Sequence, residues 1–174
     1  MLDKKMEDQL NKQVNAELYS AYMYQSMSSY LEDSGLSGMA HWMSNQAIEE
    51  MVHAKKIYDF IIERGGRALL TAIEGPPTEW KSPLDLFENA YKHETKVTGM
   101  INDLVNLAIE LKDHATNQFL QWFVAEQVEE EASADEIVQK LKIIGDGGQG
   151  MFMLDKELGQ RVAKVFPPPP SAEE

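Results

Sequence analysis

Apolar and small residues recur at alternating spacings of three and four positions along four long stretches of this chain. Such a spacing places them on one face of an α-helix, which has about 3.6 residues per turn. The stretches run from about 4 to 33, 36 to 64, 82 to 112 and 113 to 144. The pattern therefore predicts an all-α protein in which four amphipathic helices bury their apolar faces together.

The breaks between these stretches indicate the topology. Residues 33–37 and the Lys112-Asp113 junction are short, so each joins two antiparallel neighbours, whereas residues 65–82 are long enough to cross the length of a bundle. Ser82 before Pro83 is typical of a helix start, and Asp113 can cap the fourth helix. The sequence thus predicts a four-helix bundle with one long crossover.

The C-terminal part of the chain predicts one more helix. Glycines at 145, 147 and 148 end the fourth helix, and residues 151–162 can form a short fifth helix. We expect one domain over residues 1–166, because the length suits a single core, and a disordered proline-rich tail at 167–174.

Composition excludes several classes of function. The chain has no cysteine, so any metal must be held by carboxylates or imidazoles. A net charge of −13 repels phosphate backbones and anionic membranes, so neither nucleic acid nor membrane is an expected partner. No basic leader or long apolar run precedes the helices, and we therefore expect a cytoplasmic protein.

Acidic residues interrupt every predicted apolar face near the middle of the bundle. Burying several carboxylates together costs several kcal/mol for each ion, against a total stability of about 5–15 kcal/mol for a domain. No lysine or arginine lies on these faces nearby, whereas two divalent cations would balance four negative charges. The residues concerned are Glu17, Glu50, His53, Glu94, Gln127 and Glu130.

The spacing of Glu50 and His53 sharpens this interpretation. A lone histidine on an apolar face is more often structural than a ligand, and His41, His93 and His114 are interpreted in that way. Glu-x-x-His, however, places a carboxylate and an imidazole one turn apart on the same face. Mixed oxygen and nitrogen ligation suits iron(II), manganese(II) or zinc(II).

Four motifs resemble those of the prokaryotic non-haem ferritins over nearly the whole chain. They are N-A-E-L-Y-S-A-Y, E-E-M-V-H-A, Y-K-H-E and W-F-V-A-E-Q-V-E-E-E. The resemblance implies a ferritin-like four-helix bundle with a di-iron centre. The first iron would be held by Glu17, Glu50 and His53, and the second by Glu50, Glu94 and Glu130 with Gln127 beside them.

The same resemblance implies roles for further residues. Glu49, Glu126 and Glu129 would form a third iron site, turned about 100° from the buried faces. Tyr24 and Trp122 would lie beside the centre and donate electrons to oxygen, although large aromatic rings also fill bundle interiors without a redox role. Glu131 is interpreted as an ordinary solvated acid.

Met51 leaves a haem-binding alternative to be weighed. Glu50-Met51-x-His53 is similar to bacterioferritin, where a methionine ligates haem between two subunits. Bacterioferritins repeat Glu-x-x-His on the fourth helix, whereas Glu130 stands here three residues after Gln127. We therefore expect no haem and interpret Met51 as a packing residue.

The family resemblance implies an iron-storage ferritin with ferroxidase activity. It would oxidise Fe(II) to Fe(III) with O₂ or H₂O₂ and store the product as a ferric oxyhydroxide mineral inside a homo-oligomeric cage of 24 subunits. Two alternatives stay open. One is a bacterioferritin-like or rubrerythrin-like di-iron peroxidase, of which the missing cysteines disfavour the rubrerythrin-like form. The other is a cage that binds divalent metals without oxidising them.

Overall fold

The structure is a computed structural model that describes residues 2–145 and 147–164. Five helices make up the described part, which contains no strand, and this confirms the predicted all-α class. They are α1 (Lys4–Asp33), α2 (Ser37–Glu63), α3 (Pro83–Glu110), α4 (His114–Ile144) and α5 (Gly148–Leu158). The tail predicted at 167–174 lies outside the described residues.

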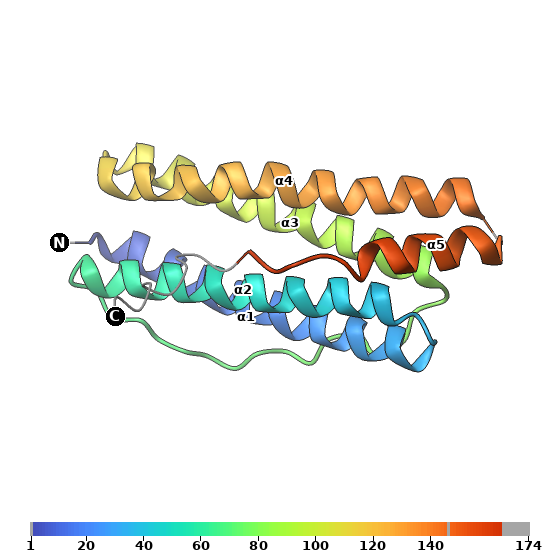
Figure 1. Ribbon diagram of the computed structural model, residues 1–174. Coiled ribbons are helices and arrows are strands. Elements are labelled where there is room, and N and C mark those ends of the chain that lie inside the picture. Colours follow the sequence, from blue (N-terminus) through green and yellow to red (C-terminus); the bar gives the residue numbers. More distant parts are fainter. Residues whose placement is uncertain (1, 146, 165–174) are drawn as a thin grey trace, which may run out of the picture.

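The four long helices pack as two antiparallel pairs, α1 with α2 and α3 with α4 (Figure 1). Contacts between α1 and α3 join the pairs, and α5 lies against α2 and α4. Two of the predicted helix starts are confirmed. The Ser82 side chain accepts from the Asp85 backbone N–H at 3.1 Å, and the Asp113 side chain accepts from Thr116 N–H at 3.1 Å. Both satisfy an N–H group that has no partner within the helix.

The long crossover runs along the outside of the α1–α2 pair, as Figure 1 shows. Side chains of α1 donate hydrogen bonds to backbone carbonyls of the crossover at intervals along the helix. These bonds supply partners for carbonyl groups that the loop cannot pair by itself. The bonds are Asn11 to Arg67 at 3.0 Å, Asn15 to Ala72 at 3.0 Å, Ser26 to Pro77 at 2.7 Å and Tyr30 to Trp80 at 2.8 Å.

The apolar core is divided into two clusters by a polar layer. One cluster surrounds Met27, Leu31 and Phe87, and the other surrounds Leu10 and Ile101. Each fully buried large side chain contributes about 1.5–3 kcal/mol relative to exposure. The buried acids lie between the clusters. Burial of the two apolar clusters therefore supplies most of the folding free energy, and the middle of the bundle can hold polar groups.

Helix α5 differs from its predicted range of 151–162, because it begins and ends earlier. Its position is fixed by the start of α2, where Asp155 accepts from the Met39 backbone N–H at 2.8 Å. A Cβ added at Gly38 would lie 1.8 Å from the Asp155 carbonyl oxygen, so only glycine permits this approach. None of the described helices is long and apolar enough to cross a membrane.

Candidate metal centre

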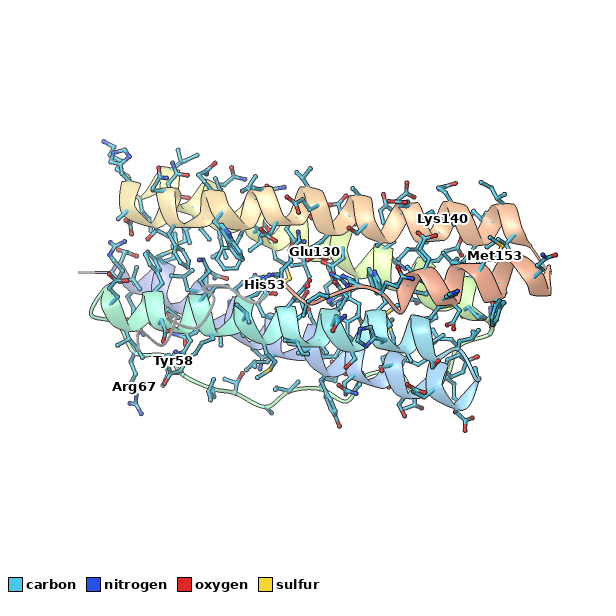
Figure 2. All side chains as sticks on the ribbon, in the orientation of Figure 1. His53, Tyr58, Arg67, Glu130, Lys140 and Met153 are labelled. Atoms are coloured by element: carbon cyan, nitrogen blue, oxygen red, sulfur yellow. The ribbon has the colours of Figure 1, made fainter. Side chains whose placement is uncertain are left out.

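Six polar side chains from four different helices are buried in the middle of the bundle. Figure 2 labels two of them, His53 on α2 and Glu130 on α4, which lie near each other between these helices. The complete set is Glu17, Glu50, His53, Glu94, Gln127 and Glu130, all buried. The structure therefore brings together every residue that the sequence assigned to the di-iron centre.

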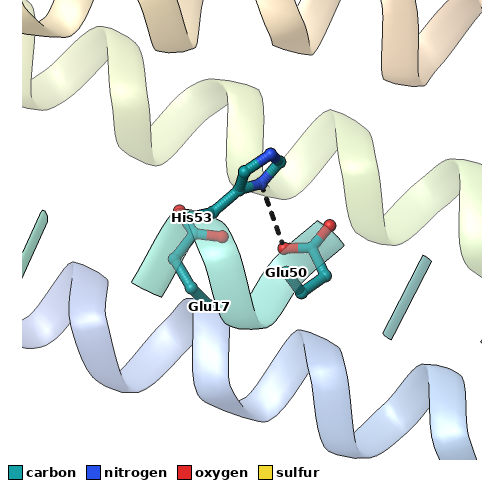
Figure 3. Close-up of side chains that lie close together, drawn as sticks. All are labelled: Glu17, Glu50 and His53. Atoms are coloured by element: carbon teal, nitrogen blue, oxygen red, sulfur yellow. Dashed lines mark ion pairs between the residues drawn. The ribbon is translucent and has the colours of Figure 1, made fainter. Parts of the chain in front are cut away.

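The first half of the centre consists of Glu17, Glu50 and His53. One ligand atom of each lies within 4.8 Å of the others, a spacing suited to a shared metal ion. His53 Nδ1 lies 3.6 Å from Glu50 Oε2, as the dashed line in Figure 3 marks. The two residues meet because a three-residue offset places them one turn apart on α2, facing Glu17 on α1.

The second half of the centre is formed by α3 and α4. The Glu94 carboxylate accepts one hydrogen bond from the Tyr24 hydroxyl and a second, at 3.3 Å, from the Gln127 amide. Glu130 Oε2 accepts from the Gln46 amide at 2.8 Å. These donors fix the carboxylates in position while other lone pairs of the same oxygens stay available to a metal.

The electrostatics of the metal-free centre favour a bound cation. Burial, followed by the neighbouring charge of Glu50, raises the pKa of Glu17 to about 8. Burial and Glu130 likewise raise the pKa of Glu94 to about 7, and burial and Glu94 raise that of Glu50 well above its usual range. Glu17 Oε2 is buried and has no hydrogen-bond partner among the described residues. A divalent ion would satisfy this oxygen and allow the carboxyl groups to ionise.

The three residues predicted as a third site are placed differently from one another. Glu126 is half-buried, and one of its oxygens lies within 4.8 Å of ligand atoms of His53 and Glu130, beside the centre. Glu49 is buried and paired with Arg161, whereas Glu129 is exposed and paired with Lys164. Within the described part of the chain they do not form one close cluster, and their joint role as a site stays a prediction.

Both predicted redox aromatics contact the centre. Tyr24 is fully buried and donates to Glu94, and burial raises its pKa well above the ordinary value, so the hydroxyl keeps its proton. The Trp122 ring meets the His53 ring edge-to-face at a centroid distance of 5.4 Å. The Lys56 ammonium lies 4.3 Å from the Trp122 ring centroid, which disfavours a positive charge on that ring. Their redox role stays a prediction.

Sequence reasoning missed the residues that orient the ligands. Gln13 donates to Glu17 Oε1 at 2.8 Å, just as Gln46 donates to Glu130. Gln13 lies four residues before Glu17, and Gln46 four before Glu50, so helical spacing was a signal that could have identified both. Thr98 accepts from the Gln127 amide at 3.3 Å, and it lies four residues after Glu94.

One interpretation of a single residue is wrong. Glu131 is half-buried and accepts from the Thr98 hydroxyl at 2.5 Å, so it belongs to the network behind Gln127 instead of being an ordinary solvated acid. Met51 is 53% exposed in the single subunit, and its interpretation as a packing residue stays a prediction. The charge run that supported the Glu131 interpretation carries no information on contacts at the margin of the buried face.

Comparison with known proteins identifies the family to which this arrangement belongs. The ferritin-like domain family matches residues 7–144. The bacterial non-heme ferritin of Bacteroides fragilis (strain 638R) is 47% identical over 161 residues, covering 92% of this chain and 100% of the relative. That of Escherichia coli O157:H7 is 39% identical over 158 residues, covering 91% of this chain and 96% of the relative.

Solved structures agree with the sequence comparison. An engineered closed form of the Archaeoglobus fulgidus ferritin has a TM-score of 0.93 and 53% identity, covering 94% of this chain and 100% of that chain. The open-pore ferritin of the same archaeon has a TM-score of 0.92 and 54% identity, covering 93% and 99% of the two chains. The buried carboxylate and histidine layer, the bundle with its long crossover and these similarities together place the chain in the ferritin-like family, among the non-haem ferritins.

Proposed function

We propose that the protein is an iron-storage ferritin with ferroxidase activity. It binds two Fe(II) per subunit, oxidises them to Fe(III) with O₂ or H₂O₂, and keeps the product as a ferric oxyhydroxide mineral. The observation that carries this proposal is the buried cluster of Glu17, Glu50 and His53, in which one carboxylate oxygen has no hydrogen-bond partner within residues 2–145 and 147–164. A buried cluster of acids without lysine or arginine is stable when cations neutralise it.

The chain's own side chains bind and orient the iron substrate, and its carboxyl groups release protons when iron binds. Glu17 and His53 hold one ion, Glu94 and Glu130 hold the other, and Glu50 lies where it can bridge both. Fe(II), when bound, supplies the electrons for reduction of the oxidant. Because the folded, metal-free centre raises the pKa of Glu17 and Glu94, loading releases their protons, and affinity therefore rises with pH.

Orientation by neighbouring amides suits this function. Gln13, Gln46 and Gln127 each donate to a carboxylate of the centre, so the acids stay in place between cycles of loading and release. Tyr24 lies against Glu94 and can give up an electron together with its hydroxyl proton. The Trp122 ring lies against the His53 ring and under the Lys56 ammonium, which makes Trp122 the less favourable electron donor of the two.

Self-assembly into a homo-oligomeric cage of 24 subunits, located in the cytoplasm, is part of the proposal. Three large apolar side chains on the outer face of α1 and α2 support it, namely Tyr22, Ile48 and Met51, which are 54%, 46% and 53% exposed. They line adjoining pockets with Leu18 between the two helices. A monomer rarely exposes a continuous apolar patch of this kind.

The function is tested by anaerobic Fe(II) loading followed by a pulse of O₂. The expected result is rapid oxidation of about two Fe(II) per subunit, as in two-metal sites generally, and then growth of electron-dense particles no larger than the assembled protein. Binding of Fe(II) without oxidation would support a metal-binding cage instead, and consumption of peroxide without mineral growth would support a peroxidase.

Replacement of Glu126 by alanine is expected to reduce the number of metals bound per subunit beyond the first two. Of the three acids predicted for the third site, Glu126 lies beside the centre, close to His53 and Glu130. Loss of Glu126 therefore removes the first ligand available to an ion that leaves the centre. The first turnover should be nearly unchanged. The measurement is stopped-flow oxidation over repeated Fe(II) additions, with Glu136→Ala on the exposed side of α4 as the control; equal recycling in both variants would remove Glu126 from the site.

A further inference from the structure

The chain continues past α5 and contacts both α2 and α4. Figure 1 shows this segment running back from α5 toward the middle of the bundle. The described residues of the segment are 159–164, and their backbone is anchored on α2. The Arg161 carbonyl oxygen accepts from the Asn45 amide at 2.8 Å and from His41 Nε2 at 2.9 Å. These bonds fix where the following side chains fall.

The anchored segment places two cations on two of the acids predicted for the third site. The Arg161 guanidinium donates to Glu49 Oε2 at 2.7 Å, and its carbon lies 4.4 Å from the Trp42 ring centroid. The Lys164 backbone N–H donates to Glu49 Oε1 at 2.5 Å, while its ammonium pairs with Glu129 on α4. Both oxygens of Glu49 are therefore occupied by the chain itself.

The Arg161–Glu49 contact is unlike an ordinary surface ion pair, which the Lys164–Glu129 contact resembles. Glu49 is only 2% exposed, whereas exposed pairs contribute little to stability. A buried carboxylate needs a partner, and loss of that partner leaves an uncompensated buried charge. The guanidinium is held on both sides, by the carboxylate and by the Trp42 ring, an arrangement that suits arginine better than lysine. The segment thus covers Glu49 and supplies its counter-charge.

We propose that Arg161 and Lys164 act as a tethered counter-cation that occupies Glu49 and Glu129 whenever no metal is bound there. A metal ion that binds these acids must displace the two side chains, so metal binding and docking of residues 159–164 weaken each other by the same factor. The segment thereby sets how tightly the subunit holds metal beyond the two ions of the centre. This inference rests on the proposed third site.

The arrangement also separates the acids of the di-iron centre from those of the predicted third site in the metal-free protein. Glu49 and Glu50 are neighbours in sequence, but Glu50 faces the centre and Glu49 faces the segment. Arg161 keeps Glu49 from adding another negative charge to the crowded centre. When the tether leaves, Glu49 becomes free to receive an ion, and its charge then favours metal moving outward from Glu50.

Zinc titration of the assembled, metal-free protein tests the proposal without any redox step. Isothermal calorimetry would compare the parent, Arg161→Gln/Lys164→Gln and the control Lys140→Gln, which removes a charge paired with Glu136 and Glu157 elsewhere on the surface. All three should bind the first two Zn²⁺ alike. Beyond two, affinity should tighten roughly fivefold or more in the double variant, a typical coupling between sites, and stay unchanged in the control.

A second measurement follows the segment itself and needs no change to it. In a Trp80→Phe/Trp122→Phe background, Trp42 is the remaining tryptophan and reports contact with Arg161. Its emission should change as Zn²⁺ binds beyond two equivalents, and adding Arg161→Gln should abolish this change.

Equal affinity beyond two Zn²⁺ in the parent and the double variant, or emission that does not respond in the Trp42 background, would overturn the inference while leaving the di-iron centre intact. Failure of the proposed function would show differently, as the absence of two tight Zn²⁺ equivalents in the parent, and that result would overturn both.

Discussion

Replacement of His53 by alanine is expected to slow Fe(II) oxidation at least about 100-fold, because removal of groups that only orient metal ligands already costs about 10- to 100-fold. His53 is the nitrogen ligand of the proposed centre, and its ring is fixed between Glu50 and Phe123. The centroids of the His53 and Phe123 rings are 6.0 Å apart. Glu130→Ala should have a similar effect, since it removes a carboxylate from the second metal position.

The bundle should survive both substitutions. The two apolar clusters lie on either side of the centre and supply most of the folding energy, so helicity and assembly should match the parent. The matched control is His114→Ala, at the exposed first turn of α4, for which the oxidation rate should not change. Stopped-flow absorbance after mixing with O₂ measures the rate, and an unaltered initial rate in His53→Ala would contradict the assignment.

The second large effect concerns stability without metal. Glu17→Gln should stabilise the metal-free protein by about 1–4 kcal/mol per subunit at neutral pH, as replacement of other buried charge clusters does. Burial raises the pKa of Glu17 from 4.5 to about 8, so folding forces this carboxyl group to take up a proton that the unfolded chain releases. Glutamine carries no such cost and can still accept the hydrogen bond from Gln13.

The sign of the pH dependence makes this prediction specific. The folded state binds more protons than the unfolded state between pH 4.5 and about 8, so the stability of the metal-free parent falls as pH rises through that window. The advantage of Glu17→Gln should vanish near pH 4.5 and grow toward pH 8. Glu94 is a poorer site for this test, because each of its two carboxylate oxygens accepts a hydrogen bond, from Tyr24 and from Gln127, and glutamine offers one acceptor oxygen in their place.

Metal should reverse the ranking. An ion that binds only the folded state stabilises it by mass action, and the parent keeps a ligand that the variant has lost. Calorimetric unfolding of parent and variant, each metal-free and each with Zn²⁺, would measure both effects, with the surface change Glu136→Gln as a control. A gain that is the same at every pH, or no gain at all, would show that Glu17 is a satisfied structural acid.

The helices and the centre were predictable because both follow from local periodicity. Glu17 and Glu94 interrupt rows of apolar residues at the spacing of one helix face, so the same pattern that predicts burial of the row also predicts burial of the acid. Antiparallel packing then brings the interruptions to the same level. Glu131, outside that pattern, was assigned less accurately, since periodicity does not report contacts at the margin of the buried face.

The C-terminal contacts could not be predicted in this way. Glu49 lies off the apolar row of α2, and it is buried only because residues 159–164 return from a distant part of the chain. The early end of α5 has the same origin. The Arg161 carbonyl oxygen accepts hydrogen bonds from Asn45 and His41, and no spacing within the segment records those tertiary partners.

Anomalous diffraction at the iron absorption edge, from crystals loaded with Fe(II) under anaerobic conditions, tests the di-iron centre most directly. We expect two peaks per subunit, one among Glu17, Glu50 and His53 and one among Glu50, Glu94 and Glu130. In His53→Ala crystals the first peak should be lost or strongly weakened. A single peak in the parent, or peaks confined to surface acids such as Glu136 with the buried layer empty, would contradict the account.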